Sequence, residues 1–235
     1  MRSPPEVRPS AACQAWRRHY GPAVAAKFPS FLLIEDETIL RELLRHNLRD
    51  AYPGCGISVA ATFAEAREKS TGTFDLVIVD LELPDGNCLD WVQEWAARKD
   101  CPRIVILSSR DQDYILYRAL HSAIPGFVHK NDSSEFFHVA IRTVLGGSTF
   151  FSPTIQRMRM RMQSSPDFYN KILSAAEQEM LKYLGMGMSN AEVAAMLGLQ
   201  VSSVSHQRQH IMRKLDLHSQ VDLMRYAIKK GFSKI

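Results

Sequence analysis

The chain has 235 residues, of which 46% are hydrophobic and 23% charged, and its formal net charge is +4. This apolar content is enough to bury one or two cores, and no stretch approaches the uninterrupted apolar length that a membrane-spanning helix requires. Four cysteines are scattered without Cys-x-x-Cys spacing (Cys13, Cys55, Cys88 and Cys101). They predict buried thiols in a reducing cytoplasm and argue against disulfides and a zinc site.

Charge is divided unevenly along the chain. Residues 1–30 are rich in proline, carry a net charge of +4 and lack the apolar core of a secretory signal, so we expect a flexible N-terminal extension or a misassigned start. Residues 31–147 carry −6, residues 148–170 carry +2 and residues 171–235 carry +4. An acidic part followed by a basic part is typical of a sensing module joined to a nucleic-acid-binding module.

Five β-strands, each followed by a helix, are predicted over residues 31–147. The expected strands are 31–34, 57–59, 74–79, 104–107 and 126–129. Apolar residues at helical spacing follow each strand, with Thr62 as the N-cap of the second helix and Asp132 or Ser133 as the N-cap of the last. This alternation predicts an α/β fold with a doubly wound, five-stranded parallel sheet in the flavodoxin-like order.

Residues 148–170 form the expected linker between the two parts. Ser152-Pro153 is a favourable start for a helix, so we expect a short helix and a loop here. Arg and Met alternate over residues 157–162, which leaves a strand or an RNA-binding patch as less favoured alternatives.

Residues 171–235 are predicted to form a small all-α domain of four helices. Capping boxes at residues 174–177 and 189–192 start the first two helices. Gly198 then provides a tight turn before a third helix over residues 201–215. Two helices that cross at a tight glycine turn are typical of a helix-turn-helix.

Polar side chains stand directly after four of the five predicted strands. The first strand runs into Glu35-Asp36, the third into Asp80, the fourth into Ser108 and the fifth into Lys130. In a parallel sheet these exits lie on one edge, where open α/β sheets place their ligand sites. Carboxylates, a hydroxyl and an amine on one edge indicate a site that moves a phosphoryl group with a divalent cation. A dinucleotide site, the rival on this fold, is excluded because acidic residues follow the first strand where a glycine-rich turn should hold pyrophosphate.

These residues, together with Pro84-Asp85-Gly86 after Asp80, give residues 31 to about 147 a resemblance to a response-regulator receiver domain. Residues from about 170 to 235 resemble the helix-turn-helix output domain of the NarL/FixJ/LuxR family. The resemblance covers most of the chain and implies that a histidine kinase or a small phosphodonor supplies a phosphoryl group to the receiver.

The resemblance also implies how the acidic residues act. Asp80 would accept the phosphoryl group and would bind Mg²⁺ together with Asp36. The carbonyl group of Glu82 would add a ligand, and Glu35 would act on the metal largely through water.

The remaining site residues would bind and sense the phosphate. Lys130 and Ser108 would each contact a phosphate oxygen. By the same resemblance, Ser108 and Phe127 would form the pair that changes position on phosphorylation.

The third helix of the C-terminal domain is predicted to read DNA. With Val204, Ile211 and Leu215 in the core, one side of this helix faces outward and carries Ser205, His206, Gln209 and Arg213. Such a helix enters the major groove, where Gln can pair with adenine. Phosphate contacts are expected from Arg208, Arg213 and Lys214. A fourth helix, over residues 219–230, is the expected dimer surface.

Taken together, the sequence predicts a cytoplasmic transcriptional response regulator that is not an enzyme and has no membrane partner. A histidine kinase with Mg²⁺ would phosphorylate it, and the phosphorylated chain would form a homodimer on double-stranded promoter DNA. A phosphorylation-independent regulator, gated by a protein partner that docks on the receiver, remains an alternative. A third alternative is a regulator that senses a small molecule and has the same output domain. It is disfavoured because it would not explain why Asp80, Lys130 and the acid pair occur together.

Overall fold

A computed structural model describes residues 28–109, 111–165 and 168–233. The N-terminal extension predicted for residues 1–30 lies outside the described residues, apart from its last three. The chain forms two compact units, one built from residues up to Ser109 together with Ser122–Ile155, and the other from Arg110–His121 together with Gln156–Ile235. Each unit is described by itself below.

The first unit is built on a parallel β-sheet, as predicted. Its strands lie in the order β2-β1-β3-β6-β7-β8, and every neighbouring pair is parallel. The strands are β1 (Ser30–Ile34), β2 (Gly56–Ala60), β3 (Leu76–Val79), β6 (Arg103–Ser108), β7 (Gly126–His129) and β8 (Phe150–Phe151). The first five were expected from the sequence. The sixth, only two residues long, comes from the segment that was expected to be linker and extends the sheet beyond β7.

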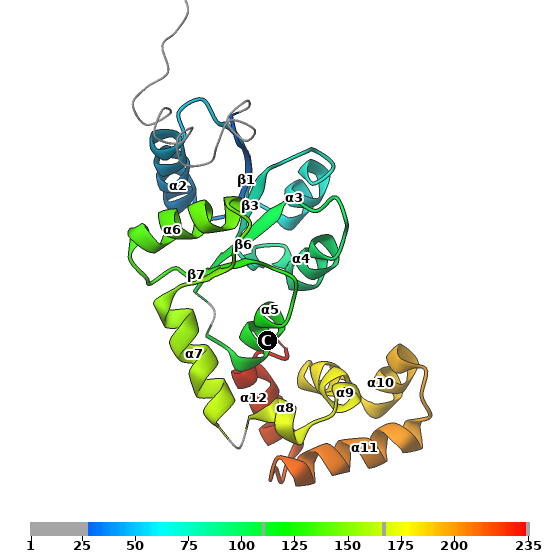
Figure 1. The fold of residues 1–235 in the computed structure, drawn as a ribbon. Helices are drawn as coiled ribbons and strands as arrows, with labels where there is room; N and C mark the ends of the chain where they lie inside the picture. The colour runs from blue at the N-terminus through cyan, green and yellow to red at the C-terminus, as the bar shows by residue number, and fades with distance from the viewer. Residues whose placement is uncertain (1–27, 110, 166–167, 234–235) are drawn as a thin grey trace, which may run out of the picture. The chain divides into compact units, whose positions relative to one another are not determined.

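Helices cover both faces of this sheet. Figure 1 shows α2 (Thr38–Ala51) and α6 (Ser134–Leu145) on one face, and α3 (Phe63–Lys69) and α4 (Leu89–Ala96) on the other. Alternate residues of the central strands point to opposite faces. Those on the α2 and α6 side form a continuous core with Leu44, Leu48, Phe137 and Ile141. The predicted N-caps at Thr62 and Ser133 are confirmed, since each accepts a backbone hydrogen bond at the start of its helix.

A short antiparallel hairpin follows β3. It consists of β4 (Glu82–Leu83) and β5 (Gly86–Asn87), so Pro84 and Asp85 form its loop and Gly86 begins its second strand. The carboxylate of Asp85 accepts hydrogen bonds from the backbone N–H groups of Phe63 (2.7 Å) and Ala64 (2.9 Å). These bonds lower the pKa of Asp85. Asp85 thereby fixes the hairpin to the start of α3, because the first N–H groups of a helix have no partner within it.

The described residues of the second unit form helices joined by loops. Its helices are α5 (Asp113–Leu120), α8 (Tyr169–Ile172), α9 (Ala175–Gly185), α10 (Asn190–Leu197), α11 (Val201–Lys214) and α12 (Gln220–Lys230), and most of α7 (Pro153–Ser164) also belongs to it. Both predicted capping boxes are present, at the starts of α9 and α10. Gly198 adopts a left-handed conformation (φ 67°) between α10 and α11, which gives the expected tight turn. Residues 157–162 are helical, which rules out the strand considered for them.

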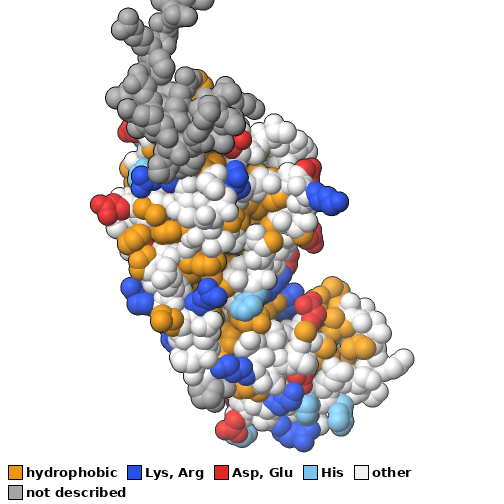
Figure 2. Space-filling model, viewed as in Figure 1, with side chains coloured by type: hydrophobic (Ala, Val, Ile, Leu, Met, Phe, Trp, Pro, Cys, Tyr) orange, Lys and Arg blue, Asp and Glu red, His pale blue; other side chains and the backbone are white. Residues whose placement is uncertain are grey.

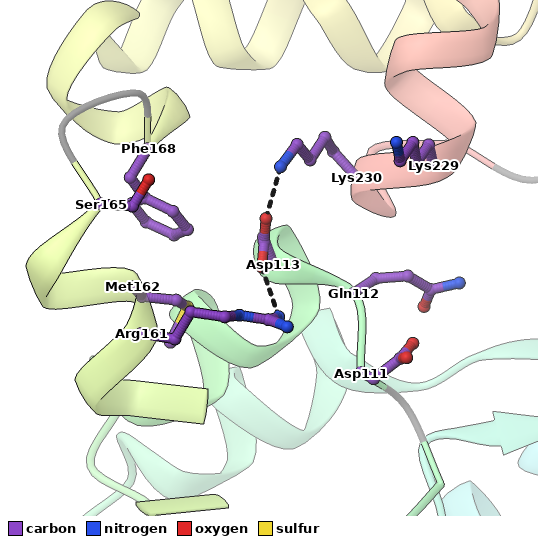
Figure 3. A pocket seen from close by; sticks show the side chains of 9 residues that line it. All are labelled: Asp111, Gln112, Asp113, Arg161, Met162, Ser165, Phe168, Lys229 and Lys230. Atoms are coloured by element: carbon purple, nitrogen blue, oxygen red, sulfur yellow. Dashed lines mark hydrogen bonds and ion pairs between the residues drawn. The ribbon is translucent and has the colours of Figure 1, made fainter. Parts of the chain in front are cut away.

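Aromatic side chains fill the core of this unit around α5. The ring of Phe232 stacks on Tyr114 with centroids 4.1 Å apart, and Tyr169 packs against both. At the first turn of α5, Asp113 pairs with Lys230 (2.6 Å) and Arg161 (3.3 Å) beside a cavity of about 430 Å³ (Figure 3). Helix α5 is therefore joined to the C-terminal helices by both apolar and charged contacts.

Gly185 lets α9 and α12 approach closely. A Cβ atom on Gly185 would lie 2.5 Å from the side chains of Ala227 and of Ser233, closer than real Cβ contacts allow. We expect Gly185→Ala to lower the free energy of unfolding by about 1–3 kcal/mol, because extra atoms in a filled core force neighbours to shift. Urea denaturation followed by circular dichroism measures this loss. Gly56→Ala is the control, since nothing lies within 4 Å of its added methyl group. Equal stability of the two variants would contradict the close approach.

Candidate functional site

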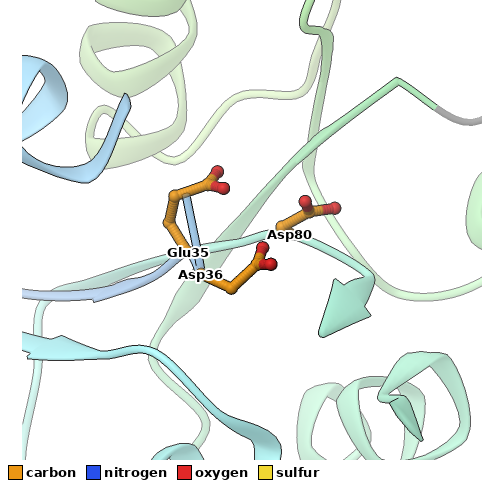
Figure 4. Close-up of side chains that lie close together, drawn as sticks. All are labelled: Glu35, Asp36 and Asp80. Carbon is orange, nitrogen blue, oxygen red and sulfur yellow. The ribbon is translucent and has the colours of Figure 1, made fainter. Parts of the chain in front are cut away.

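The acidic residues meet where neighbouring strands end. Because β1 and β3 pair in parallel, with Ile34 opposite Val79, the residues that follow them emerge side by side. Glu35 and Asp36 follow β1 and Asp80 follows β3, and a carboxylate oxygen of each lies within 4.8 Å of the others (Figure 4). Asp80 and Glu35 are buried. Burial of carboxylates costs free energy unless a cation or hydrogen bonds stabilise them, so this cluster requires a positive partner.

Lys130 is the positive partner within the chain. It follows β7, and its Nζ atom donates a hydrogen bond to Oδ2 of Asp80 (2.8 Å) and to Oε1 of Glu35 (3.0 Å). Burial raises the pKa values of Asp80 and Glu35, and the nearby ammonium group offsets part of that effect. Burial alone would lower the pKa of Lys130, but its bonds to the two carboxylates outweigh burial and raise it. The lysine is therefore a fixed positive charge, as binding of a phosphate oxygen requires.

Glu35 has capacity for a further ligand. Its Oε2 atom is buried and accepts no hydrogen bond from the described residues. Lys130 Nζ lies 3.0 Å from Oε2, at ion-pair distance but without hydrogen-bond geometry. Three carboxylates, one of them with a buried oxygen that accepts no hydrogen bond, fit a divalent cation such as Mg²⁺, which prefers oxygen ligands.

The other predicted site residues surround this cluster. The backbone N–H of Glu82, in β4, donates to Oδ1 of Asp80 (3.1 Å). Ser108 ends β6 and is fully buried, and its carbonyl oxygen accepts a hydrogen bond from the backbone N–H of Lys130 (3.1 Å). Phe127 lies in β7 and is buried. The structure thus brings Glu35, Asp36, Asp80, Glu82 and Lys130 together at one edge of the sheet, with Ser108 at the end of the next strand.

Arg41 supports the site and was not foreseen from the sequence. From the first turn of α2, its Nη1 atom donates to the carbonyl oxygens of Glu35 (2.8 Å) and Asp36 (2.9 Å). It holds the backbone of the acid pair without occupying their carboxylates. In the sequence, Arg41 is only a basic residue soon after the two acids. Its role could not be predicted without knowing where the helix begins.

The predicted DNA-reading residues all lie on α11. Val204 and Ile211 are buried, as predicted, whereas Leu215 is only half-buried. His206, Gln209, Arg213 and Lys214 are exposed, and Ser205 and Arg208 are half-buried. Figure 2 shows Lys, Arg and His side chains gathered along the edge of the C-terminal unit where Figure 1 places α11.

Two of the three expected phosphate-binding residues also have partners inside the unit. Arg208 donates a hydrogen bond to the side chain of Asn190 (3.2 Å). Lys214 pairs with Glu177 (2.8 Å), which also contacts Nδ1 of His210 (2.9 Å). Burial would raise the pKa of Glu177, but these partners and Ser174 outweigh burial and lower it to about 2. Glu177 therefore joins α9 to α11, a role that was not predicted from the sequence.

None of the helices among the described residues is both long and apolar enough to cross a membrane.

Comparison with known proteins gives two family matches. Residues 31–142 match the response regulator receiver domain, and residues 171–227 match the luxR family of bacterial regulatory proteins. The chain is 34% identical over 159 residues to the Fimbriae Z protein of Escherichia coli (strain K12), covering 67% of this chain and 75% of that protein. It is 32% identical over 167 residues to the oxygen regulatory protein NreC of Staphylococcus epidermidis, covering 66% of this chain and 76% of that protein.

The fold is also shared with a solved structure. RcsB from Salmonella enterica serovar Typhimurium, bound to a promoter in the presence of the phosphomimetic BeF3⁻, matches with a TM-score of 0.60 at 19% identity. The match covers 87% of this chain and 100% of that chain. The two family matches and the relatives establish that the chain belongs to the NarL/FixJ-type response regulators, which join a receiver domain to a LuxR-type helix-turn-helix domain.

Proposed function

We propose that this chain is a two-component transcription regulator whose binding to promoter DNA is controlled by phosphorylation of Asp80. In this proposal residues 31–147 form the receiver, 148–170 the linker and 171–235 the DNA-binding domain. The observation that carries the proposal is the cluster at the strand ends, where a buried Asp80 lies 2.8 Å from Lys130 and beside two further acids. Structural roles alone rarely place three carboxylates and one lysine at the ligand-binding edge of a parallel sheet.

Phosphoryl transfer to Asp80 depends on alignment and on charge neutralisation. An oxygen of the Asp80 carboxylate attacks the phosphorus of a phosphohistidine in a histidine kinase; the new P–O bond forms as the P–N bond breaks, and the imidazole nitrogen leaves with the electron pair and takes up a proton. Lys130 then neutralises a phosphate oxygen, and Ser108 donates its hydroxyl to another. Phe127 fills the space that Ser108 leaves.

Mg²⁺ would be held by Asp36, Asp80, the carbonyl group of Glu82 and, largely through water, Glu35. When bound, it would supply positive charge for the transferred phosphoryl group. The buried Oε2 atom of Glu35, which accepts no hydrogen bond from the described residues, supports this assignment.

The output of the switch is DNA binding by α11. Ser205, His206 and Gln209 would contact base edges in the major groove, and Arg208, Arg213 and Lys214 would contact phosphates. Helix α12 would form the two-fold dimer surface, so that phosphorylation shifts an existing equilibrium toward a homodimer in the cytoplasm.

Selection from a pool of random duplexes tests DNA reading. The full chain, treated with Mg²⁺ and beryllofluoride, is expected to enrich a two-fold symmetric site, because a dimer presents α11 twice. Gln209→Ala and His206→Ala should change or weaken the enriched sequence, whereas His46→Ala, an exposed histidine on α2, should not. Enrichment of no sequence, or of the same sequence by all variants, would contradict the assignment of α11.

A further inference from the structure

A polar network fastens the start of α7 to the strand that leads to Lys130. Ser152, which immediately precedes α7, is fully buried. Its backbone N–H donates to the carbonyl oxygen of Phe127 (3.0 Å), and its Oγ atom accepts from the backbone N–H of His129 (3.0 Å). Ser152 is therefore bonded to β7 on both sides of Val128, and this part of β7 leads directly to Lys130.

Asp132 completes this network from the other side of Lys130. Its carboxylate accepts hydrogen bonds from the backbone N–H of Thr154 (3.2 Å) and from Oγ1 of Thr154 (2.6 Å). Burial would raise the pKa of Asp132, but bonds from Ser152 and Thr154 outweigh it and lower the pKa. Thr154 lies in the first turn of α7, whose N–H groups have no partner within the helix, so Asp132 serves as a cap supplied by a distant segment.

Lys130 and Asp132 are only two residues apart, and hydrogen bonds to His129 hold the backbone between them. Neither residue can therefore move without the other. The backbone N–H of Asp132 donates to the carbonyl oxygen of His129 (2.9 Å), and the N–H of Asn131 donates to Nδ1 of the buried His129 (3.2 Å). A displacement of the Lys130 backbone would therefore displace Asp132 as well. Ile155, fully buried one residue after Thr154, holds the same turn of α7 in the first unit.

We propose that Asp132 is a positioning residue that couples the phosphate site to the linker helix α7, by fixing the first turn of α7 to the loop that carries Lys130. This role rests on the proposed function. Lys130 is bonded to Asp80 and Glu35 in the described structure, and a phosphoryl group on Asp80 brings new oxygen acceptors that redistribute those bonds. Asp132 passes the resulting shift to Thr154, and thus to the segment that leads to the DNA-binding domain.

A capping residue of purely structural importance would change stability but leave the response to phosphorylation intact. The two roles are therefore distinguished by the effect of treatment on DNA binding. This effect is measured as the Kd of the full chain for DNA without beryllofluoride and Mg²⁺, divided by its Kd with them. We expect Asp132→Asn to reduce this ratio by about tenfold, within the range typical of coupling between two sites. Thr154→Val, which removes only the hydroxyl donor, should reduce it in the same direction. Uptake of a phosphoryl group from acetyl phosphate should remain that of the wild type.

Glu135→Gln is the matched control, because Glu135 is an exposed acid in the first turn of α6. A wild-type ratio in both Asp132→Asn and Thr154→Val would overturn the coupling role. Loss of phosphoryl uptake in these variants would also overturn it, because the substitutions would then have disrupted the cluster around Asp80 and not its coupling to α7. If the wild-type chain binds DNA equally with and without beryllofluoride, the proposed control by phosphorylation fails first, and this coupling role fails with it.

Discussion

Asp80→Asn is expected to abolish uptake of a phosphoryl group from acetyl phosphate in the presence of Mg²⁺. The amide has nearly the shape of the carboxylate, but it is not a nucleophile and binds cations poorly. Lys130 keeps its bond to Glu35 in this variant, so the fold should remain intact. Intact-protein mass spectrometry measures the covalent phosphoryl group directly.

The matched control for this prediction is Asp50→Asn, which changes an exposed aspartate near the end of α2. It should accept a phosphoryl group as the wild type does. Uptake by Asp80→Asn at the wild-type level would show that another residue is the acceptor, and the site at the strand ends would then need a different explanation.

Glu177→Gln is expected to be much more damaging than the same change in the second capping box, Glu192→Gln. Both glutamates bond the N-cap serine of their helix, but only Glu177 also holds Lys214 and His210 of α11. Hydrogen bonds that involve charged groups contribute more than neutral ones, so we expect Glu177→Gln to lower the free energy of unfolding by about 2 kcal/mol. Urea denaturation of the two variants at neutral pH checks the difference, and equal losses would contradict the role of Glu177.

The same residue predicts a dependence of stability on pH. Because folding lowers the pKa of Glu177 from 4.5 to about 2, its contribution is complete above pH 4.5 and is lost as the pH falls from 4.5 toward 2. Thermal unfolding of the wild type should therefore lose more stability over that interval than Glu177→Gln does. If the stability of the two proteins falls equally between pH 4.5 and pH 2, the partners of Glu177 do not stabilise its charged form.

The arrangement of the acidic cluster and Lys130 at the strand ends could be predicted because it depends on local patterns. Apolar runs that end in Asp80 and in Glu35-Asp36 mark buried strands with polar exits, and parallel pairing places those exits together. Pro84-Asp85-Gly86 after Asp80 is typical of a turn that ends a strand, whereas the hairpin found there is defined by pairing between β4 and β5. In contrast, strand β8 could not be predicted, because a two-residue strand is defined by its pairing with β7 and has no period of its own.

Contacts between distant segments explain the other omissions. Asp132 was considered as the N-cap of α6, yet Ser133 has that role and Asp132 caps α7 instead. Glu177 was predicted as part of a capping box, which is correct, but its pairing with Lys214 joins residues 37 positions apart. Local spacing identifies which residues can cap or bind, whereas the choice among partners depends on packing that brings distant elements together.

The measurement that most directly tests the account is the affinity of the full chain for its selected DNA site before and after treatment with beryllofluoride and Mg²⁺, at one fixed salt concentration. Salt must be held constant because phosphate contacts make the affinity depend on it. We predict binding that is tighter by about tenfold or more after treatment, accompanied by dimer formation, and no change in Asp80→Asn. Equal affinity in all states would contradict control by phosphorylation and would favour a regulator gated by a protein partner on the receiver.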